Sequence, residues 1–119
     1  MAMQTQRVRI VLRHITGSRA TQVDEIALGA HRELILGRAA SAAVRFDPRR
    51  DTVVGRQHAR IEPDPAGGRF RLADLGSVNG TWLNGVRLEA PAWLAPGDRL
   101  RLGEHGPELE FSLEPLPDP

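Results

Sequence analysis

Apolar and polar residues alternate along most of the chain, and this period of two is typical of β-strands. Val8, Ile10 and Leu12 share one strand face, and Leu34 and Leu36 share another. The same spacing recurs in Val44 with Phe46, Phe70 with Leu72, Leu100 with Leu102, and Leu109 with Phe111 and Leu113. No ten-residue stretch shows a convincing helical pattern, so we predict an all-β chain.

Turn-forming residues separate these runs and predict short connections. The turn signals are Thr16-Gly17-Ser18, Asp64-Pro65-Ala66-Gly67-Gly68, Asn84-Gly85, Pro96-Gly97-Asp98 and Gly106-Pro107. Asn84-Gly85 predicts a two-residue hairpin, because both residues tolerate a positive φ. Many short strands at close spacing predict an antiparallel β-sandwich or barrel, in which function lies on the loops.

The length of 119 residues fits one domain with a single core. We expect a flexible N-terminus over residues 1–6, the domain over residues 7–113 and a proline-rich tail or linker over residues 114–119. The absence of Cys excludes a disulfide framework, a thiolate zinc site and a cysteine nucleophile. No run approaches the roughly 20 apolar residues of a membrane span, and the first residues lack an apolar signal core. We therefore predict a soluble, cytoplasmic chain without membrane insertion.

All sixteen basic residues are Arg, and fifteen acidic residues nearly balance them, leaving a formal net charge of +1. Because Lys is absent, a Schiff-base lysine and a P-loop are excluded. Arg suits two-pronged recognition of phosphate better than Lys does, although a composition bias toward Arg and Ala explains the Lys deficit equally well. The arginines are scattered among acids, which argues against a nucleic-acid partner.

Three segments combine residues that could carry chemistry. Gly37-Arg38 follows a predicted strand directly, so Arg38 projects its donors from a rigid strand end. The second segment runs from Val53 to Ile61, and the third runs from Asp74 to Gly85 and contains both Asn residues of the chain. Taken alone, each segment is explained as ordinary turn structure.

Together, in this order and spacing, the three segments resemble the forkhead-associated (FHA) domain family. Gly37-Arg38, then Gly55-Arg56-Gln57-His58, then the stretch from Asp74 to Gly85 follow the family's layout of GR, SxxH and (S/T)xNG. The resemblance covers residues 7–113. It implies an eleven-stranded β-sandwich that recognises phosphothreonine in a partner protein.

The resemblance also assigns the ligand residues. A phosphate carries about −1.5 to −2 charge and three strong acceptors, so its site needs a fixed cation and several donors. Arg38 would be the primary phosphate ligand, and Arg56 with the backbone N–H groups of Gly55 and Gln57 would surround the same anion, beside Val78. Asn79 would hydrogen-bond the peptide backbone next to the phosphothreonine. Residues that would contact the flanking ligand positions are Ala39, Ala40 and Ser41.

Other motif residues are expected to support the loops. By the resemblance, His58 braces them through hydrogen bonds. The remaining supporting residues are Gly37, Gly76, Ser77, Gly80, Thr81 and Trp82. A Ser77–His58–Asp74 triad can be imagined, but nothing in the resemblance aligns it and no oxyanion loop is apparent, so we expect no enzymatic activity. The four histidines lack the paired spacing of metal ligands, and we expect no metal or cofactor.

Two positions depart from the family pattern. Gly55 stands where the family usually has a Ser that donates to the phosphate, and Val78 stands where it often has a Thr with a second hydroxyl donor. A hydrogen bond to a charged group is worth about 1.5–3 kcal/mol. Losing two could weaken phosphate affinity by about ten- to a thousandfold or more, unless water or Arg56 substitutes.

Two functions therefore remain open. The first is a phosphothreonine-dependent adaptor, with a phosphate site that the two departures could weaken, whose partner is a threonine-phosphorylated protein: a Ser/Thr kinase substrate or the kinase itself. The second is a scaffold of the same fold that binds partners or itself independently of phosphorylation, as the loss of both hydroxyls suggests. The first predicts that Arg38 is essential for binding, and the second predicts that it is not.

Overall fold

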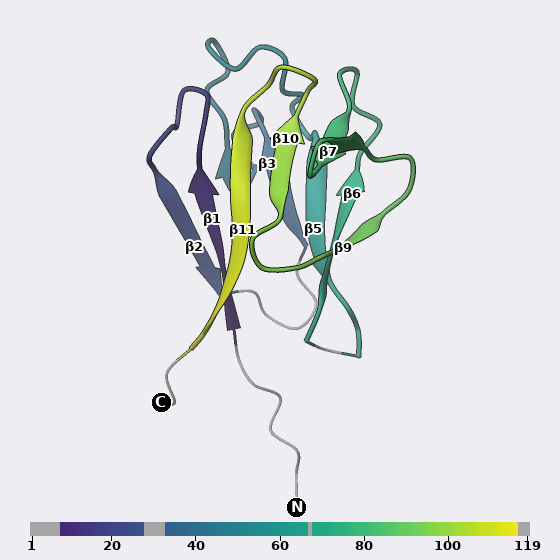
Figure 1. Cartoon of the computed structure of the whole chain (residues 1–119). Coiled ribbons are helices and arrows are strands. Elements are labelled where there is room, and N and C mark those ends of the chain that lie inside the picture. Colours follow the sequence, from purple (N-terminus) through teal and green to yellow (C-terminus); the bar gives the residue numbers. More distant parts are fainter. Residues whose placement is uncertain (1–7, 28–32, 67, 117–119) are drawn as a thin grey trace, which may run out of the picture.

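The computed structural model describes residues 8–27, 33–66 and 68–116, which form a sandwich of two β-sheets (Figure 1). The strands of the first sheet, in spatial order, are β2 (Val23–Ala27), β1 (Val8–His14), β11 (Glu108–Pro115), β10 (Arg99–Leu102), β7 (Thr81–Leu83) and β8 (Val86–Arg87). Those of the second sheet are β4 (Val44–Arg45), β3 (Leu34–Gly37), β5 (Ala59–Pro63), β6 (Phe70–Asp74) and β9 (Ala92–Leu94). The prediction of an eleven-stranded all-β sandwich is confirmed.

One strand pair departs from the predicted antiparallel arrangement. Strands β3 and β4 run parallel, with Leu36 beside Val44 and Gly37 beside Arg45. The pairing covers only these two positions, so residues 38–43 are enough to return the chain to the side of β3. The other strand pairs in the described part of the chain are antiparallel.

The alternating apolar residues of the sequence fill the space between the sheets. Every second residue of β1 faces inward, and Ile10 and Leu12 are fully buried. The buried core also includes Leu34, Leu36, Val44, Phe46, Val54, Ala59, Ile61, Phe70, Leu72, Leu94, Leu100, Leu102, Leu109 and Phe111. Burial of this apolar surface is the main force that holds the two sheets together.

The Asn84-Gly85 hairpin prediction is also confirmed. Asn84 and Gly85 have φ angles of 50° and 83°, and they join β7 to β8 with Leu83 opposite Val86. Two positive φ angles give this turn the twist that a two-residue hairpin requires.

The chain remains in strand beyond the predicted end of the domain. Strand β11 continues through Pro115, and the register places Glu114 opposite Arg9 and Pro115 opposite Val8. The Arg9 guanidinium donates to the Glu114 carboxylate over 2.7 Å. Glu114 and Pro115, expected to begin the tail, therefore belong to β11. Residues 1–6 of the expected N-terminus and residues 117–119 of the expected tail lie outside the described residues.

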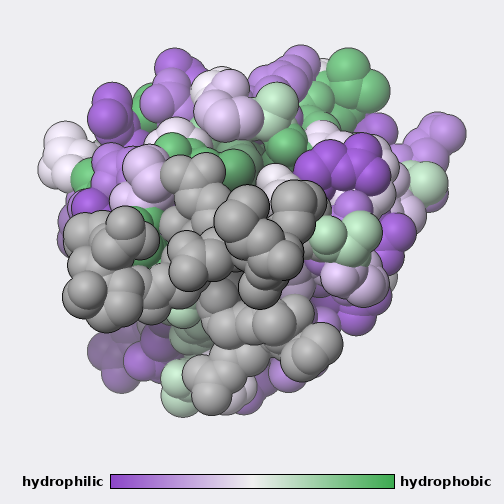
Figure 2. All heavy atoms as spheres, turned by 90° about the horizontal axis from the view of Figure 1, so that it is seen from below, coloured by the Kyte–Doolittle hydropathy of each residue, from purple (hydrophilic) through white to green (hydrophobic). Residues whose placement is uncertain are grey.

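Five loops lie at one end of the sandwich, at the top of Figure 1. They are the connections β1–β2, β3–β4, β4–β5, β6–β7 and β10–β11. The opposite end is seen in Figure 2, where hydrophilic side chains make up most of the coloured surface and hydrophobic atoms form scattered patches. All three candidate segments of the sequence reach the loop end, because β3 and β6 end there and β5 begins there.

Candidate functional site

Two of the candidate segments are joined at the end of β3. The backbone N–H of Arg38 donates to the carbonyl oxygen of Gly55 over 3.0 Å, and that of Ala39 donates to the carbonyl oxygen of Arg56 over 3.0 Å. These bonds extend the β3–β5 pairing into the loops. Arg38 therefore lies beside the β4–β5 loop, as the sequence layout requires.

Gly37 allows this close approach. A Cβ atom at position 37 would lie 2.0 Å from the carbonyl oxygen of Arg56 and 2.6 Å from its carbonyl carbon. Backbone atoms cannot yield to such an overlap without moving the whole loop. The glycine is thus needed for contact between two chain segments rather than for a turn.

The Arg38 side chain is half-buried and is oriented by two backbone carbonyls. Its Nε donates to Val54 O, and its Nη1 donates to Pro48 O over 2.9 Å. Three of its five N–H groups remain for other acceptors. No carboxylate in the described ranges pairs with this guanidinium. The guanidinium group is therefore held in one orientation, and no carboxylate of the described residues neutralises its charge.

His58 links the β4–β5 loop to the β6–β7 loop. It is fully buried, and its Nδ1 accepts the N–H of Gly55 over 2.9 Å. The proton therefore sits on Nε2, which donates to the carbonyl oxygen of Gly80 over 2.7 Å. Burial lowers the pKa of His58, although the Gly80 carbonyl and the charge of Asp74 act in the opposite direction. Neutral His58 is a brace for both loops.

Asp74 organises the β6–β7 loop from the end of β6. Its carboxylate accepts the N–H groups of Gly76 and Ser77, each over 3.0 Å, and the hydroxyls of Ser77 and Thr81. Burial alone would raise the pKa of Asp74, but these hydrogen bonds outweigh it and lower the pKa. Gly76 and Gly80 have φ angles of 74° and 83°, which glycine adopts without strain.

Asn79 and Val78 stand at the exposed tip of this loop. The Asn79 side-chain amide donates to Val53 O over 2.8 Å, so it connects the tip to the β4–β5 loop. Its carbonyl oxygen and second amide hydrogen make no hydrogen bond within the described part of the chain. Val78 is 91% exposed and packs against almost nothing. An apolar side chain so placed contacts solvent or a ligand.

The structure changes the expected roles of two residues. Gly55 cannot direct its N–H at an anion, because His58 already accepts that hydrogen. Ala39, expected to contact a ligand, is only 6% exposed, whereas Ala40 and Ser41 are exposed. Arg56 and Gln57 are exposed, and their backbone N–H groups have no acceptor among the residues described.

The geometry does not assemble the imagined triad. The Ser77 hydroxyl donates to Asp74, and both ring nitrogens of His58 are engaged with backbone groups. No group of three or more His, Cys, Asp or Glu side chains in the described ranges could hold a metal ion, and His31 lies outside those ranges. No helix in the same ranges is long and apolar enough to cross a bilayer.

A family model described as the FHA domain matches residues 34–103. This chain belongs to the FHA domain family. The match covers the strands from β3 to β10 and all three segments of the candidate site. FHA domains are a family of non-catalytic interaction modules.

Individual relatives support this assignment. Glycogen accumulation regulator GarA of Mycolicibacterium smegmatis is 39% identical over 68 residues, which cover 57% of this chain and 40% of GarA. The chain thus matches less than half the length of this relative. Among solved structures, one from an analysis of phosphothreonine-dependent FHA domain interactions is 34% identical, with a TM-score of 0.72 and coverage of 91% of this chain and 99% of that one. The FHA domain of FhaA, complexed with the intracellular domain of Rv3910, is 31% identical, with a TM-score of 0.69 and coverage of 87% and 99%.

Sequence reasoning missed two supporting residues. Asp51 is only 6% exposed and accepts the Asp47 N–H over 3.0 Å and the Ser18 hydroxyl, which ties the β1–β2 loop to the β4–β5 loop. Arg87 of β8 lies over Gly80, so that a Cβ atom at position 80 would be 2.7 Å from the Arg87 Nε. Neither residue belongs to a motif, and their partners are distant in sequence, so no local signal marks them.

Proposed function

We propose that this domain binds a threonine-phosphorylated segment of another protein at its loop end, with Arg38 as the primary phosphate ligand. The observation that carries the proposal is the Arg38 guanidinium, which two carbonyls orient and no described carboxylate neutralises. A phosphate that approaches Nη2 and the remaining hydrogen of Nη1 gains charge-assisted hydrogen bonds from this group. Because the side chain is already oriented, little conformational entropy is lost on binding.

Further donors surround the position that a phosphate would occupy. The backbone N–H groups of Arg56 and Gln57 have no acceptor in the described residues, and Arg56 adds a second exposed guanidinium. Asn79 retains an acceptor and a donor for the ligand backbone. These groups replace part of what the hydroxyls at positions 55 and 78 would supply.

The similarity to FHA domains of phosphothreonine-dependent interactions supports the same ligand class. The partner would be a kinase substrate or a kinase that carries phosphothreonine itself. The cytoplasmic location stays a prediction from the sequence.

A phosphopeptide library tests the proposal without knowledge of the partner. Peptides with a fixed central phosphothreonine and degenerate flanks are titrated against the domain, in parallel with phosphoserine and unphosphorylated versions. We expect binding of the phosphothreonine library and its loss in Arg38→Ala. The matched control is Arg13→Ala, which removes one exposed charge from strand β1, outside the loops of the site. Equal binding of phosphorylated and unphosphorylated peptides would overturn the proposal.

The exposed apolar tip favours the second candidate, an interaction that does not need phosphate. Val78 is 91% exposed, and Val53 beside Asn79 is 41% exposed. A partner captured through this tip would bind Arg38→Ala as well as the unchanged domain, and would lose affinity in Val78→Asp. The opposite pattern in these two variants assigns the interaction to the phosphate site.

A further inference from the structure

Unpaired arginines gather at the loop end, although Arg13 of β1 and Arg101 of β10 also have no carboxylate partner among the described residues. Six arginines pair with carboxylates: Arg9, Arg19, Arg60, Arg69, Arg71 and Arg99. Six others reach the loop end without a carboxylate partner among the described residues: Arg38, Arg45, Arg49, Arg50, Arg56 and Arg87. The acids nearby are fewer: Asp47, Asp51 and Asp74 accept hydrogen bonds from backbone or hydroxyl groups, and Glu104 is exposed in the β10–β11 loop. Arginines therefore outnumber acids at the loop end, although the whole chain is almost neutral.

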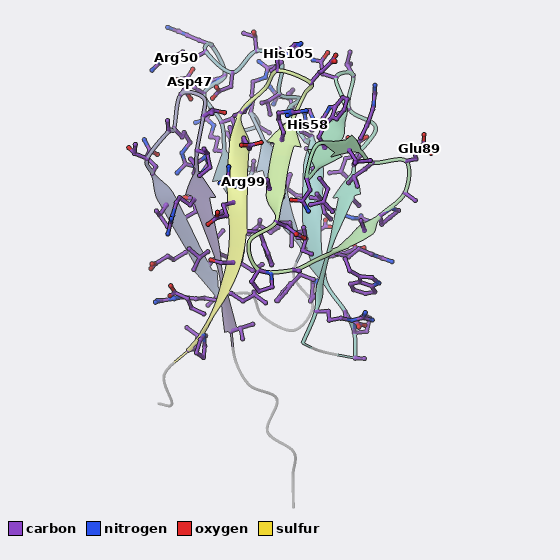
Figure 3. All side chains as sticks on the ribbon, in the orientation of Figure 1. Asp47, Arg50, His58, Glu89, Arg99 and His105 are labelled. Carbon is purple, nitrogen blue, oxygen red and sulfur yellow. The ribbon has the colours of Figure 1, made fainter. Side chains whose placement is uncertain are left out.

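A hollow of about 390 Å³ lies among these arginines, between the β1–β2 loop and the start of the β4–β5 loop. Its lining includes Arg19, Arg45, Asp47, Pro48 and Arg50. Figure 3 shows Arg50 and Asp47 at the top of the molecule, above β1 and β2. The hollow is large enough for a carboxylate side chain or a phosphate group.

The hollow adjoins Arg38. The carbonyl of Pro48, which lines the hollow, accepts Arg38 Nη1 over 2.9 Å. Arg45, another lining residue, donates from Nε to the carbonyl oxygen of Arg38 over 3.4 Å. The hollow therefore lies next to the Arg38 guanidinium.

The charges of the lining favour an anion. Asp24 neutralises Arg19 through two bonds of 2.8 and 2.9 Å, which also fix its position. Arg45 and Arg50 have no such partner in the described part of the chain. Asp47 opposes an anion, but its Oδ1 is covered by the N–H groups of Arg49 and Arg50 at 2.8 and 2.9 Å. The lining therefore holds two arginines without a carboxylate partner among the described residues and one carboxylate, Asp47, whose Oδ1 already accepts two backbone hydrogen bonds.

We propose that this hollow binds a second anionic group of the phosphorylated ligand, held by Arg45 and Arg50. The chemistry fits either an acidic side chain or a second phosphate a short distance from the phosphothreonine. The inference rests on the proposed function, because the phosphate at Arg38 brings the second anion to the hollow. An extended peptide advances about 3.3 Å per residue, so an anion roughly two to four residues away can enter it.

Five phosphothreonine peptides test this inference. One has neutral flanks, two carry Glu two to four residues before or after the phosphothreonine, and two carry a phosphoserine in those same ranges. Affinities are measured by isothermal titration at low and at high salt. We expect the peptides that carry the anion on one side of the phosphothreonine, either before or after it, to bind about fivefold more tightly than the neutral peptide. The gain in affinity should be larger for phosphoserine than for Glu, and it should shrink at high salt.

Variants locate the effect. Arg45→Gln and Arg50→Gln should each remove most of the gain while affinity for the neutral peptide changes less than about twofold. Arg13→Gln, which removes one charge outside the hollow, should keep the gain. A gain that survives both hollow variants, or that Arg13→Gln also removes, overturns the inference.

The two proposals fail in different ways. If the neutral phosphothreonine peptide binds and the anionic peptides bind no better, only the second anion site is refuted. If no phosphothreonine peptide binds, the proposed function itself is refuted, and this inference with it.

Discussion

Arg38 and Gly55 show at the scale of single residues how the site is built and what it lacks. Two carbonyls orient the Arg38 guanidinium, while the Gly55 N–H is consumed by His58. The cation is therefore in place, but position 55 offers the ligand no donor. A serine hydroxyl at this position would supply a donor. There is room for the side chain, because a Cβ atom at position 55 would lie no closer than 3.7 Å to any atom of the described residues beyond its own chain neighbours.

We accordingly predict that Gly55→Ser increases affinity for phosphothreonine peptides by roughly tenfold, since a hydrogen bond to a charged group is worth about 1.5–3 kcal/mol. The measurement is isothermal titration with one peptide in its phosphorylated and unphosphorylated forms. Gly55→Ala is the matched control, because it adds the Cβ without the hydroxyl. A similar gain in Gly55→Ala, or a gain for the unphosphorylated peptide, would contradict this explanation.

The buried His58 leads to a second prediction at this scale, which concerns how the stability of the domain depends on pH. Its pKa in the folded domain is lowered by burial, so the unfolded chain takes up the proton first as pH falls. The free energy of unfolding is therefore fully retained above the ordinary pKa of about 6.5 and decreases as pH falls from there toward the lowered value. Protonation would also place a hydrogen on Nδ1, against the N–H of Gly55.

Urea unfolding between pH 7.5 and pH 5.5 measures this effect. We expect the loss of stability across this range to be smaller in His58→Gln than in the unchanged domain. Burial also lowers the pKa of His14, but His14 is present in both chains, so the difference between their pH profiles isolates His58. Parallel profiles would show that His58 does not titrate in this way.

At the scale of elements, the packing of β3 against the β4–β5 loop decides where Arg38 points. We predict that Gly37→Ala destabilises the domain by roughly 1–3 kcal/mol, because the new methyl group overlaps the carbonyl of Arg56 at 2.0 Å. If the loop moves away instead, the carbonyls that orient Arg38 move with it, and phosphopeptide affinity falls. Urea unfolding measures the loss of stability, and peptide titration measures the loss of affinity. Gly55→Ala is the control, because it also adds one methyl group, but on the β4–β5 loop and without a close contact. Wild-type stability together with wild-type affinity would refute the close contact.

The elements also show what the sequence can and cannot predict. Alternation marks Ile10 and Leu12 as core, and Asn84-Gly85 marks a hairpin, because both signals are local. The parallel pairing of β3 with β4 leaves no local signal, since two residue pairs are too few for a pattern. The use of the Gly55 N–H by His58 is equally hidden, because a motif gives the residues of a loop but not the direction of its amides.

For the molecule as a whole, the distribution of charge matters more than its sum. Carboxylates pair with four strand arginines, Arg9, Arg60, Arg71 and Arg99, whereas the loop end keeps several unpaired guanidinium groups among the described residues. A positive end on a nearly neutral domain attracts an anionic ligand from a distance and orients it before contact. Such steering acts on the association rate and is weakened by salt.

We therefore predict that Arg49→Glu slows association with a phosphothreonine peptide by roughly three- to tenfold at low ionic strength and changes the dissociation rate little. The Arg49 side chain is exposed and makes no hydrogen bond in the described residues, so the change alters the local field without removing a contact. Stopped-flow fluorescence at several salt concentrations gives both rates. Arg13→Glu changes the net charge equally but on β1, and should slow association much less. If both variants slow it equally, net charge rather than the position of the arginines controls the encounter, and the loop end has no special role in attracting the ligand.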